Sequence, residues 1–437
     1  MKNKWISNRL EDITYKVLDF RGKTPLKLGM DWGGGEIRAL SANNVEMGKV
    51  NFEKECYFGS DKLYKKWMNK GDCEEGDVLL TMEAPLGNVA QVPDNKKYIL
   101  SQRTILLKFK KDEIDKKFIF HLFSGECFQK HLQQNSTGST VLGIQQKKLA
   151  KIKLSYPKDL GLQHKIAKIL NTVDAVIEKT EAAIAKYRAI KQGMMQNLFT
   201  RGINLQTGQL RPAYKDAPHL YKETELGWIP KQWNLGKLSD SAAGKHYSFT
   251  GGPFGSDLQT KDYTLAGVQI IQLQNIGDGE FINKSIVFTS QQKANDLRSC
   301  NIYPGDIIIA KMAEPVARAC IIPDFTNRFL MASDGIRLSI DEKKFNNLFV
   351  KESINNNYFR SQAIAKSTGT TRERIGLTEL RNIKFKYPQL EEQNLIAEKI
   401  QSMDKIILKE QANLAKHQSL KKGLMQDLLT GKVEVEV

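Results

Sequence analysis

Two stretches of the chain decide its fold. The first is QHKIAKILNTVDAVIEKTEAAIAKYRAIKQGMMQNLFT (163–200), and the second is QNLIAEKIQSMDKIILKEQANLAKHQSLKKGLMQDLLT (393–430). Aligned without gaps at an offset of 230 residues, they share fifteen identical residues of thirty-eight, far more than chance supplies. Similarity at a fixed offset is the mark of an internal repeat. The chain is therefore a tandem repeat.

The similarity continues upstream of both stretches. Residues 137–157 (TGSTVLGIQQKKLAKIKLSYP) match residues 368–388 (TGTTRERIGLTELRNIKFKYP) at an offset of 231. Further upstream only a skeleton remains, consisting of Gly76 to Leu80 with Gly305 to Ile309, Pro93-Asp94 with Pro323-Asp324, and Asn44 with Asn275. Each repeat is thus a divergent globular part followed by a long helix.

The length of the chain agrees with this organisation, because 437 residues exceed the roughly 150 that are typical of one domain. Residues between the halves are rich in Gly, Pro and polar side chains without sustained periodicity, which indicates a connector. The expected order is a first globular domain at 1–160, a long helix at 161–202, the connector at 203–235, a second globular domain at 236–390 and a long helix at 391–432.

Each globular part is expected to mix helices and strands, which makes the fold class α+β. Short aliphatic runs bounded by Gly-Asp or Pro-Asp turns predict strands at 78–80, 104–109, 307–310 and 335–340. The segments KIKLSYP (151–157) and NIKFKYP (382–388) alternate strictly, so apolar residues should lie on one face of each strand and lysines on the other. Helical stretches are predicted at 116–132 and 346–366.

Apolar residues recur along both long stretches at steps of four and three, which predicts a heptad seam. At about 1.5 Å per residue each helix would be roughly 55 Å long, so we expect the pair to act as a spacer between the two globular domains. The seam residues are Ile166, Leu170, Val173, Ile177, Ile184, Ile396, Ile400, Met403, Ile407 and Leu414.

An antiparallel pairing of the two helices suits the lysines of the seam. A parallel pair would set Lys191 against Lys421 in one layer. In an antiparallel pair whose facing residue numbers sum to 594, Lys191 meets Met403 and Lys421 meets Val173, and each ammonium group can extend to the surface. The alternative is that each helix packs only on its own domain or forms a homodimer.

A glycine recurs inside both predicted helices, at Gly193 and Gly423. Glycine in a helix interior costs about 1 kcal/mol relative to alanine. Its recurrence at one repeat position indicates a close approach of another backbone or the docking of a partner, and a tolerated kink fits the sequence equally well.

The composition is that of a folded protein with an excess of positive charge. The formal net charge is +17, a balance that favours polyanionic partners such as nucleic acid. The five cysteines show neither a C-x-x-C pair nor zinc-finger spacing, so buried reduced thiols are expected. No apolar run approaches the ~18 residues of a membrane span and the N-terminus has no apolar signal core, so we expect a cytoplasmic protein.

Several segments together resemble one known family. Both globular parts end in a TG-S/T-T loop and a strand with a terminal proline, and the long helices close in GMMQNLFTRG (193–202) and GLMQDLLTGK (423–432). The segment YKETELGWIPKQW (221–233) is similar to that family's usual entry to a second target-recognition domain. On these motifs, over essentially its whole length, the chain resembles the specificity subunit of type I restriction-modification systems.

This resemblance implies two target-recognition domains on an antiparallel helix pair, with methyltransferase subunits docking on that frame and restriction (motor-nuclease) subunits joining through them. It also implies that this chain holds no cofactor, since S-adenosylmethionine, ATP and magnesium are expected on the partner subunits. A repeat with an antiparallel spacer presents two reading surfaces to double-stranded DNA about one helical turn, ~34 Å, apart. Because the two globular sequences differ, we expect a bipartite, asymmetric DNA target.

Candidate DNA contacts are residues able to read base edges or hold phosphates. Hydroxyl-and-glycine loops that recur in both repeats are the strongest of them, because glycine permits close approach of the backbone. In the first domain the candidates are Arg21, Lys23, Thr24, Asn43, Asn44, Gln102, Arg103, Thr137, Gly138, Ser139 and Thr140. In the second they are Ser248, Thr250, Gly255, Ser256, Gln272, Gln274, Asn275, Lys311, Thr368, Gly369, Thr370, Thr371, Arg372 and Arg374.

No catalytic or metal site is expected in the chain. Val17 stands where a phosphate-binding loop ending in Gly22-Lys23-Thr24 would need glycine, and no N/D-P-P-Y/F methyltransferase motif is present. The enzymatic alternative is a metal-dependent nuclease that uses Asp324, Glu342 and Lys344. The non-enzymatic alternative is a DNA-recognition subunit of an orphan methylation complex, or of another defence complex, that lacks the nuclease.

Overall fold

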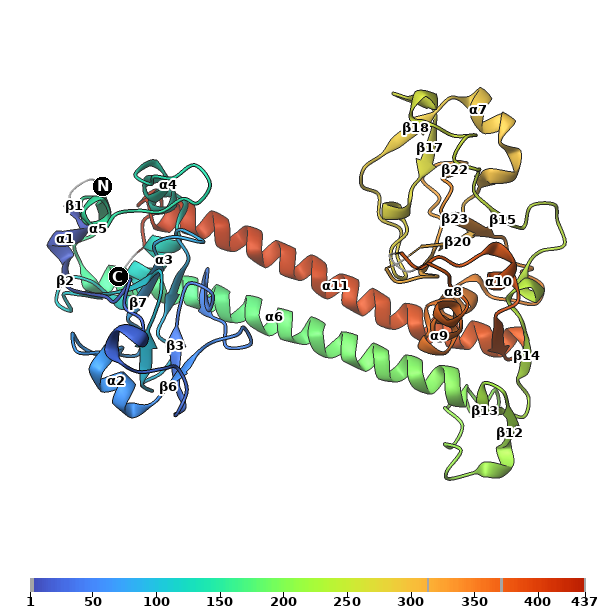
Figure 1. The fold of residues 1–437 in the computed structure, drawn as a ribbon, viewed down its shortest axis with the longest axis horizontal. Coiled ribbons are helices and arrows are strands. Elements are labelled where there is room, and N and C mark those ends of the chain that lie inside the picture. Colours follow the sequence, from blue (N-terminus) through green and yellow to red (C-terminus); the bar gives the residue numbers. More distant parts are fainter. Residues whose placement is uncertain (1–3, 313, 370–371, 436–437) are drawn as a thin grey trace. The chain divides into compact units, whose positions relative to one another are not determined.

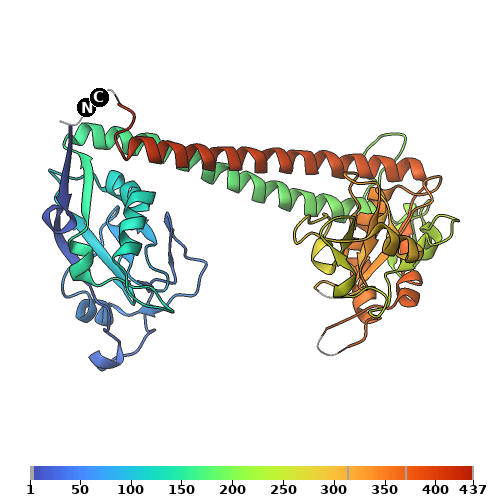
Figure 2. The ribbon, with the colours of Figure 1, turned by 90° about the horizontal axis from the view of Figure 1, so that it is seen from above.

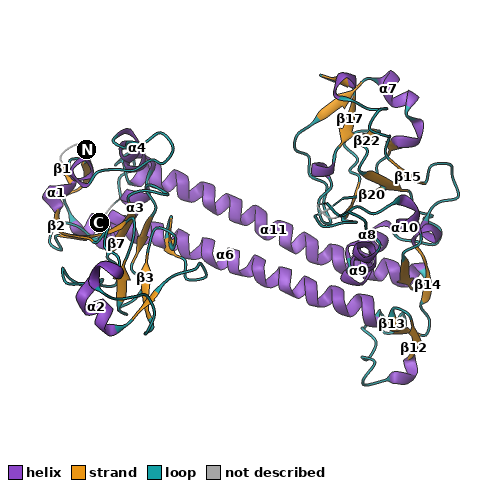
Figure 3. Ribbon diagram, viewed as in Figure 1, coloured by secondary structure: helices purple, strands orange, loops and turns teal. Residues whose placement is uncertain are grey.

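The computed structural model describes residues 4–312, 314–369 and 372–435 of the chain. The chain divides into two compact units, one formed by residues 1–183 and 410–437 and the other by residues 184–409. Each unit combines sheets with short helices and contains one part of each long helix (Figure 1, Figure 3). The α+β class is therefore confirmed. Within the described residues, no helix has the length and apolar content needed to cross a membrane.

The first unit is built around a four-stranded antiparallel sheet in the order β2-β10-β7-β8. A second sheet has the order β6-β3-β9, and β1 pairs antiparallel with β11. The strands are β1 Trp5–Arg9, β2 Thr14–Asp19, β3 Ile37–Leu40, β4 Val45–Glu46, β5 Lys49–Val50, β6 Phe58–Gly59, β7 Val78–Thr81, β8 Val89–Gln91, β9 Tyr98–Leu100, β10 Thr104–Phe109 and β11 Lys153–Pro157. The short helices are α1 Leu10–Ile13, α2 Asp61–Trp67, α3 Lys116–Ser124, α4 Glu126–Gln134 and α5 Gln146–Ala150.

The second unit repeats this plan with the sheets β15-β23-β20-β21 and β16-β18-β17-β22-β19 and the pair β14-β24. Its strands are β12 Tyr221–Thr224, β13 Gly227–Pro230, β14 Asn234–Lys237, β15 Phe249–Gly251, β16 Tyr263–Thr264, β17 Val268–Ile271, β18 Val287–Thr289, β19 Asn301–Ile302, β20 Ile307–Ala310, β21 Ala319–Ile321, β22 Phe329–Met331, β23 Gly335–Leu338 and β24 Lys384–Tyr387. Its short helices are α7 Gln291–Asp296, α8 Asn347–Asn355, α9 Asn357–Ala365 and α10 Leu377–Arg381.

The recurring Gly-Asp step forms the same turn before the central strand of each unit. The glycine, Gly76 or Gly305, has a positive φ of 78° or 85°, which favours a residue without a side chain. The aspartate accepts a hydrogen bond from the backbone N–H three residues earlier, at 3.0 Å for Asp77 and 2.9 Å for Asp306. Both aspartates are buried and form ion pairs with cations of the adjacent strand. The similarity of the two sequences at this step is therefore structural.

Each predicted single helix before the TG-S/T-T loops is two helices. The stretch at 116–132 breaks at Gly125 between α3 and α4, and the stretch at 346–366 breaks at Asn356 between α8 and α9. Both residues have an extended backbone with ψ of 150° and 147°, and the side chain of Asn356 accepts a hydrogen bond from Tyr358 N. The apolar periodicity continues through both breaks, which is why it concealed them.

The long helices are α6, Leu160–Arg201, and α11, Leu390–Leu428. In the first unit Lys421 Nζ lies 2.5 Å from Asp174 Oδ1, and in the second unit Lys191 Nζ lies 2.6 Å from Asp404 Oδ1. Higher numbers on α6 thus face lower numbers on α11, so the helices are antiparallel, as predicted (Figure 1, Figure 2). The facing residues of the ion pairs sum to 595, next to the predicted 594.

The two ion pairs are repeats of each other, because Lys191 and Lys421 occupy one repeat position and Asp174 and Asp404 another. Each lysine leaves the seam and reaches the carboxylate one residue beyond the apolar residue that was expected to face it. The same lysine-aspartate contact thus recurs once in each unit. All ten predicted seam residues are buried or half-buried.

Both long helices are anchored at their beginnings by the same glutamine. Gln163 accepts a hydrogen bond from Asp115 N and donates to the carbonyl oxygens of Glu113 and Pro157, all at 2.9 Å. Gln393 makes the same three bonds, all at 3.0 Å, to the corresponding backbone groups of the second unit. Both side chains are fully buried. The start of each long helix is therefore fixed to the globular part that precedes it.

Residues 203–235, predicted as a connector, are partly ordered into β12, β13 and the start of β14. Arg211 donates two hydrogen bonds to the carboxylate of Glu392, at 2.5 and 2.8 Å. The same carboxylate accepts bonds from Trp233 Nε1 at 3.0 Å and from Ile203 N at 2.8 Å. These buried charge-assisted bonds make the segment an integral part of the second unit, which composition alone did not indicate.

Gly193 and Gly423 have open space at the position where a side chain would begin. We therefore expect Gly193→Ala to raise the free energy of unfolding by about 0.5–1 kcal/mol, because alanine loses less backbone freedom on folding. Urea denaturation followed by circular dichroism would measure this change. The control is Gly202→Ala, whose Cβ would lie 2.2 Å from Glu392 Oε1 at a φ of +64°, and which should destabilise the chain. Destabilisation by Gly193→Ala would point to a close backbone approach instead.

Candidate nucleic-acid interface

The TG-S/T-T loops are hairpin loops of the same construction in both units. Thr137 and Gly143 exchange backbone hydrogen bonds at 2.8 and 3.0 Å, and Thr368 and Arg374 exchange them at 2.9 Å. Gly138 and Gly369 follow the threonines with φ of 120° and 107°. The loop residues Thr137, Gly138, Ser139, Thr140, Thr368, Gly369 and Arg372 are exposed, whereas Thr370 and Thr371 lie outside the described residues.

A second recurring loop follows the first strand of each main sheet. Gly29 N donates to Leu26 O, and Asp257 N donates to Phe254 O, both at 2.9 Å, so each turn is closed by a backbone bond between residues three apart. The predicted residues Gly255 and Ser256 are exposed in this turn, and Thr24 accepts a weak bond from Lys27 N at 3.4 Å.

The predicted cations Arg21 and Lys23 are occupied by contacts within the first unit. The guanidinium of Arg21 binds Asp19 with Nε and Nη2, at 3.0 and 2.6 Å. Burial alone would raise the pKa of Asp19, but the bonds from Arg21 outweigh that effect and lower it. Lys23 Nζ donates to Trp67 O at 2.7 Å and lies 5.2 Å from the centre of the Phe20 ring. Both side chains would have to leave these partners to reach DNA.

Three predicted contact residues are buried, and the expectation that they touch DNA is corrected. Asn44 is 1% exposed and Asn275 is 0% exposed. Asn275 Nδ2 donates to the carbonyl oxygens of Ile282 and Lys284. Asn44 Nδ2 makes longer bonds, of 3.3 to 3.5 Å, to the carbonyl oxygens of Asn51, Lys54 and Glu55. Ser248 is 8% exposed. The recurrence of the asparagines therefore reflects the folding of a turn.

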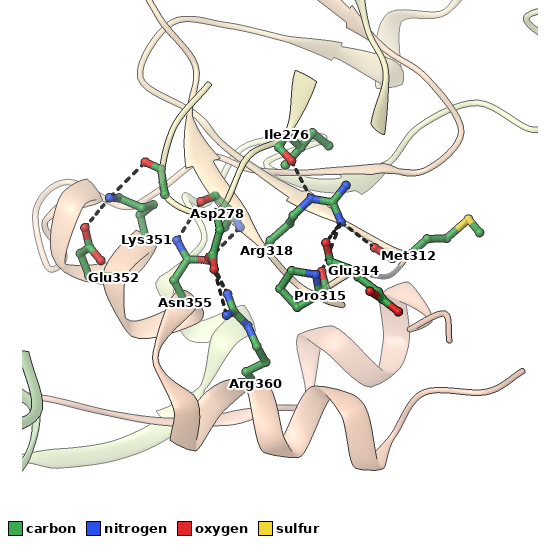
Figure 4. Close-up of polar contacts among 12 residues, drawn as sticks. Ile276, Asp278, Met312, Glu314, Pro315, Arg318, Lys351, Glu352, Asn355 and Arg360 are labelled. Carbon is green, nitrogen blue, oxygen red and sulfur yellow. Dashed lines mark hydrogen bonds and ion pairs between the residues drawn. The ribbon is translucent and has the colours of Figure 1, made fainter. Parts of the chain in front are cut away.

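Arg318, which the sequence did not single out, connects two loops of the second unit (Figure 4). Its Nε donates to Ile276 O at 2.6 Å and its Nη2 to Leu273 O at 3.0 Å. Its Nη1 donates to the carbonyl oxygens of Met312, Glu314 and Pro315. Burial lowers the pKa of this guanidinium. Arg318 thus holds the turn that carries Gln272 and Gln274 against a loop next to Arg374.

The first unit has a shorter form of the same connection. Asn88 aligns with Arg318 at the offset of 230, and its Nδ2 donates to Val45 O at 2.9 Å. Val45 directly follows Asn44, as Ile276 follows Asn275. Asn88 and Arg318 both lie between the matched Gly-Asp and Pro-Asp motifs. The sequence could have shown this pair if the offset of 230 had been applied to each polar residue of that segment.

Four predicted residues of the second unit line one cavity of about 580 Å³, namely Thr250, Gly255, Lys311 and Arg374. Lys311 Nζ donates to Ser333 O at 3.0 Å. Burial lowers the pKa of Lys311, and the nearby Arg374 lowers it further. Arg374 forms an ion pair with Asp334. The lining therefore combines a glycine-rich backbone and two cations with one carboxylate, that of Asp257.

The remaining predicted residues lie at the surface or close to it. Gln102 and Arg103 are exposed, and Arg103 Nε lies 3.5 Å from Glu83 Oε1. Asn43 is exposed and donates to Glu55 O at 3.0 Å. Gln274 is exposed and donates to Gln272 Oε1 at 2.8 Å, which directs the two amides together.

The residues of the nuclease alternative do not form a metal site in the structure. Asp324, Glu342 and Lys344 are exposed, in the turn before β22 and in the turn after β23. Across residues 4–312, 314–369 and 372–435, no group of three or more His, Cys, Asp or Glu side chains could hold a metal ion. The described side chains therefore give this alternative no support.

A family model of the type I restriction modification DNA specificity domain matches residues 2–186 and 264–416, one segment in each repeat. The chain belongs to this family. Both TG loops and both Gly-Asp turns lie within the matched segments, whereas the turn from Phe254 to Asp257 lies before the second segment. Most residues of α6 and α11 also lie within the matched segments.

Relatives and solved structures agree with this assignment. The chain is 26% identical to a type I restriction enzyme MjaVIII specificity subunit of Methanocaldococcus jannaschii, covering 97% of both chains. It is 22% identical to the EcoBI specificity subunit of Escherichia coli, covering 70% of this chain and 62% of the relative. Its fold is similar to the S subunit of a type I system from M. genitalium, with a TM-score of 0.56, 14% identity, and coverage of 98% of this chain and 97% of the other.

Arg372 is the exposed cation at the tip of the second TG loop, so Arg372→Ala should weaken binding of target DNA roughly tenfold, about 1.4 kcal/mol. Fluorescence anisotropy with labelled duplex would measure the affinity, and circular dichroism should show an unchanged fold. Lys343→Ala, which removes another exposed cation, from the turn after β23, is the control. Equal binding by Arg372→Ala and the parent chain would remove this residue from the interface.

Gly138→Ala should open the first TG loop, because the added Cβ would lie 2.0 Å from Val141 O at a φ of +120°. We expect loss of DNA affinity with little change in unfolding free energy, since the loop is exposed. Hydrogen exchange at Gly143 N–H, which donates to Thr137 O, would report the opening. Retained protection together with unchanged DNA binding would contradict this role.

Proposed function

We propose that the chain reads a bipartite, asymmetric DNA target, with one half-site recognised by each unit. The observation that carries the proposal is the recurrence of one scaffold with different side chains in its exposed loops. The tips of the TG loops illustrate this difference, because Val141 and Leu142 occupy the first and Arg372 and Glu373 the corresponding part of the second. Two similar supports with different contact residues would select two different base sequences.

The excess of positive charge supports DNA as the ligand. With 66 Lys and Arg against 49 Asp and Glu, the chain attracts a polyanion without any single basic tail. Backbone phosphates would be held by exposed loop amides and cations such as those of the second-unit cavity, whereas amides such as Gln274 suit adenine edges.

In this proposal the chain is the non-catalytic member of a complex. Partner methyltransferase subunits would bring S-adenosylmethionine, and restriction subunits would bring ATP and magnesium, while this chain directs both to the target in the cytoplasm. Co-purification with a methyltransferase but without a motor subunit would instead identify a solitary methylation complex.

Methylated bases mapped by long-read sequencing in cells with and without this chain would test the proposal. We expect chain-dependent methylation at a motif of two unlike half-sites separated by a gap of unspecified bases. Arg372→Ala should relax the requirement at only one half-site, because the residue belongs to one unit. A single continuous target or a palindromic one would overturn the proposal.

A further inference from the structure

Arg318 lies at the edge of the main sheet of the second unit, directly before β21. Its backbone continues that sheet, because Ala310 N at the end of β20 donates to Arg318 O at 2.9 Å. Only 9% of the residue is exposed. The beginning of the side chain is therefore held by the sheet, while its guanidinium group binds the neighbouring loops (Figure 4).

The guanidinium group joins two segments that are distant in the sequence. In the first segment it donates to the carbonyl oxygens of Ile276 and Leu273, at 2.6 and 3.0 Å. In the second segment its acceptors are the carbonyl oxygens of Met312, Glu314 and Pro315, at 3.1, 3.2 and 3.3 Å. Because these acceptors are backbone groups, Arg318 fixes the backbone of one segment relative to the other.

The first segment carries a pair of amides that suits a base edge. Gln274 Nε2 donates to Gln272 Oε1 at 2.8 Å, and Gln272 Nε2 donates to Tyr263 Oη at 3.4 Å. Gln274 is exposed. An amide recognises adenine by bonding to N6 and N7 together, so its discrimination depends on its position relative to the duplex. A shift of this turn would therefore weaken base discrimination more than it weakens phosphate binding.

The second segment is bonded to the base of the second TG loop. Met312 and Arg374 form an antiparallel β-bridge, and Ile375 N donates to Lys311 O at 2.9 Å. An exposed loop with a glycine and hydroxyl groups suits the DNA backbone, whose contacts set the register of a protein on the duplex. Arg318 thus connects an element suited to the DNA backbone with an element suited to a base edge.

The burial of Arg318 indicates a positional role more than a contribution to stability. The five acceptors named above are neutral, and burial lowers the pKa of the guanidinium. Burial of a charge among neutral groups is costly. In the first unit the neutral Asn88 occupies this repeat position and bonds to Val45 O at 2.9 Å. The second unit therefore has a costly cation at a position where a neutral amide also bonds to the turn.

We propose that Arg318 is a positioning residue for base recognition. It holds the turn of Gln272 and Gln274 in register with the second TG loop, and it thereby determines the base preference of the second half-site without contacting DNA itself. This inference rests on the proposed function, because it assigns the source of specificity at one of the two half-sites.

The test measures base discrimination by Arg318→Met in the full chain. Discrimination is the ratio of affinities for the mapped target and for a duplex with one base pair changed, measured by competition in fluorescence anisotropy. We expect this ratio to fall roughly tenfold at one or more positions of the second half-site and to stay parental throughout the first. Affinity for a duplex of unrelated sequence should stay within about twofold, because phosphate contacts supply it.

Two further variants make this test specific. Asn88→Ala alters the same repeat position of the other unit, so it is the matched control and should leave the second half-site at its parental discrimination. Arg318→Lys keeps the charge but lacks the planar fork that reaches both segments, so it should lose discrimination as Arg318→Met does.

Hydrogen exchange reports the same change without DNA. Ile276 N donates to Leu273 O within the turn, and protection of this N–H should fall in Arg318→Met and in Arg318→Lys. Protection of Ala310 N–H, which donates to the backbone oxygen of residue 318, should be retained, because the substitution leaves that bond in place. This pair of amides separates a loosened turn from a disrupted sheet.

Three results would overturn the inference. The first is parental discrimination, or parental protection of Ile276 N–H, in Arg318→Met. The second is a loss that extends to the first half-site, to unrelated duplexes or to Ala310 N–H, since Arg318 would then support the fold as a whole. The third is full discrimination by Arg318→Lys. Failure of the proposed function would look different, because the parent chain would bind no bipartite target while Ile276 N–H still responded to the substitution.

Discussion

The burial of both ends of each long helix is the constraint on which the two units depend. In the first unit Ile166 and Leu170 of α6 share one core with Leu428, the last residue of α11, and with Leu429, which follows it. In the second unit the corresponding residues of the other helix, Ile396 and Ile400, pack with Leu198 and Phe199. Each globular part therefore completes its core with two helices that belong to different repeats. Burial of their apolar surface stabilises the folded state by about 25 cal/mol per Å².

This constraint explains why the repeats have diverged unevenly. The helix residues contact cores, partner helices and backbone anchors at once, so few substitutions satisfy all of these contacts. The exposed TG loops have only local requirements, such as a positive φ at Gly138 and Gly369. Asn44 and Asn275, with Asn88 and Arg318 beside them, fix the position of loops whose exposed side chains remain free to differ.

Sequence reasoning reached the features that depend on regular periodicity. The strands around Leu154 and Phe385 and the antiparallel helices follow from alternation and heptad spacing, and both are confirmed. It failed where one pattern has two physical causes. Asn44 and Asn275 were candidates for DNA contact because an amide can read a base edge, but an amide can equally fold a turn, and both side chains are buried in turns. Lys386 was expected on the lysine face of its strand, yet only 5% of the residue is exposed. Alternation predicts which residues share a face of a strand, but it does not predict which other elements cover that face.

The division of the chain into units also has a consequence for its biosynthesis. The second unit is one continuous segment, residues 184–409, whereas the first needs residues 410–437 to complete it. As the polypeptide leaves the ribosome, the domain that emerges first must wait for the very last helix turns before its apolar wall is covered. A released chain that stops before residue 410 would therefore have a complete second unit and an uncovered, chaperone-accessible apolar surface on the first.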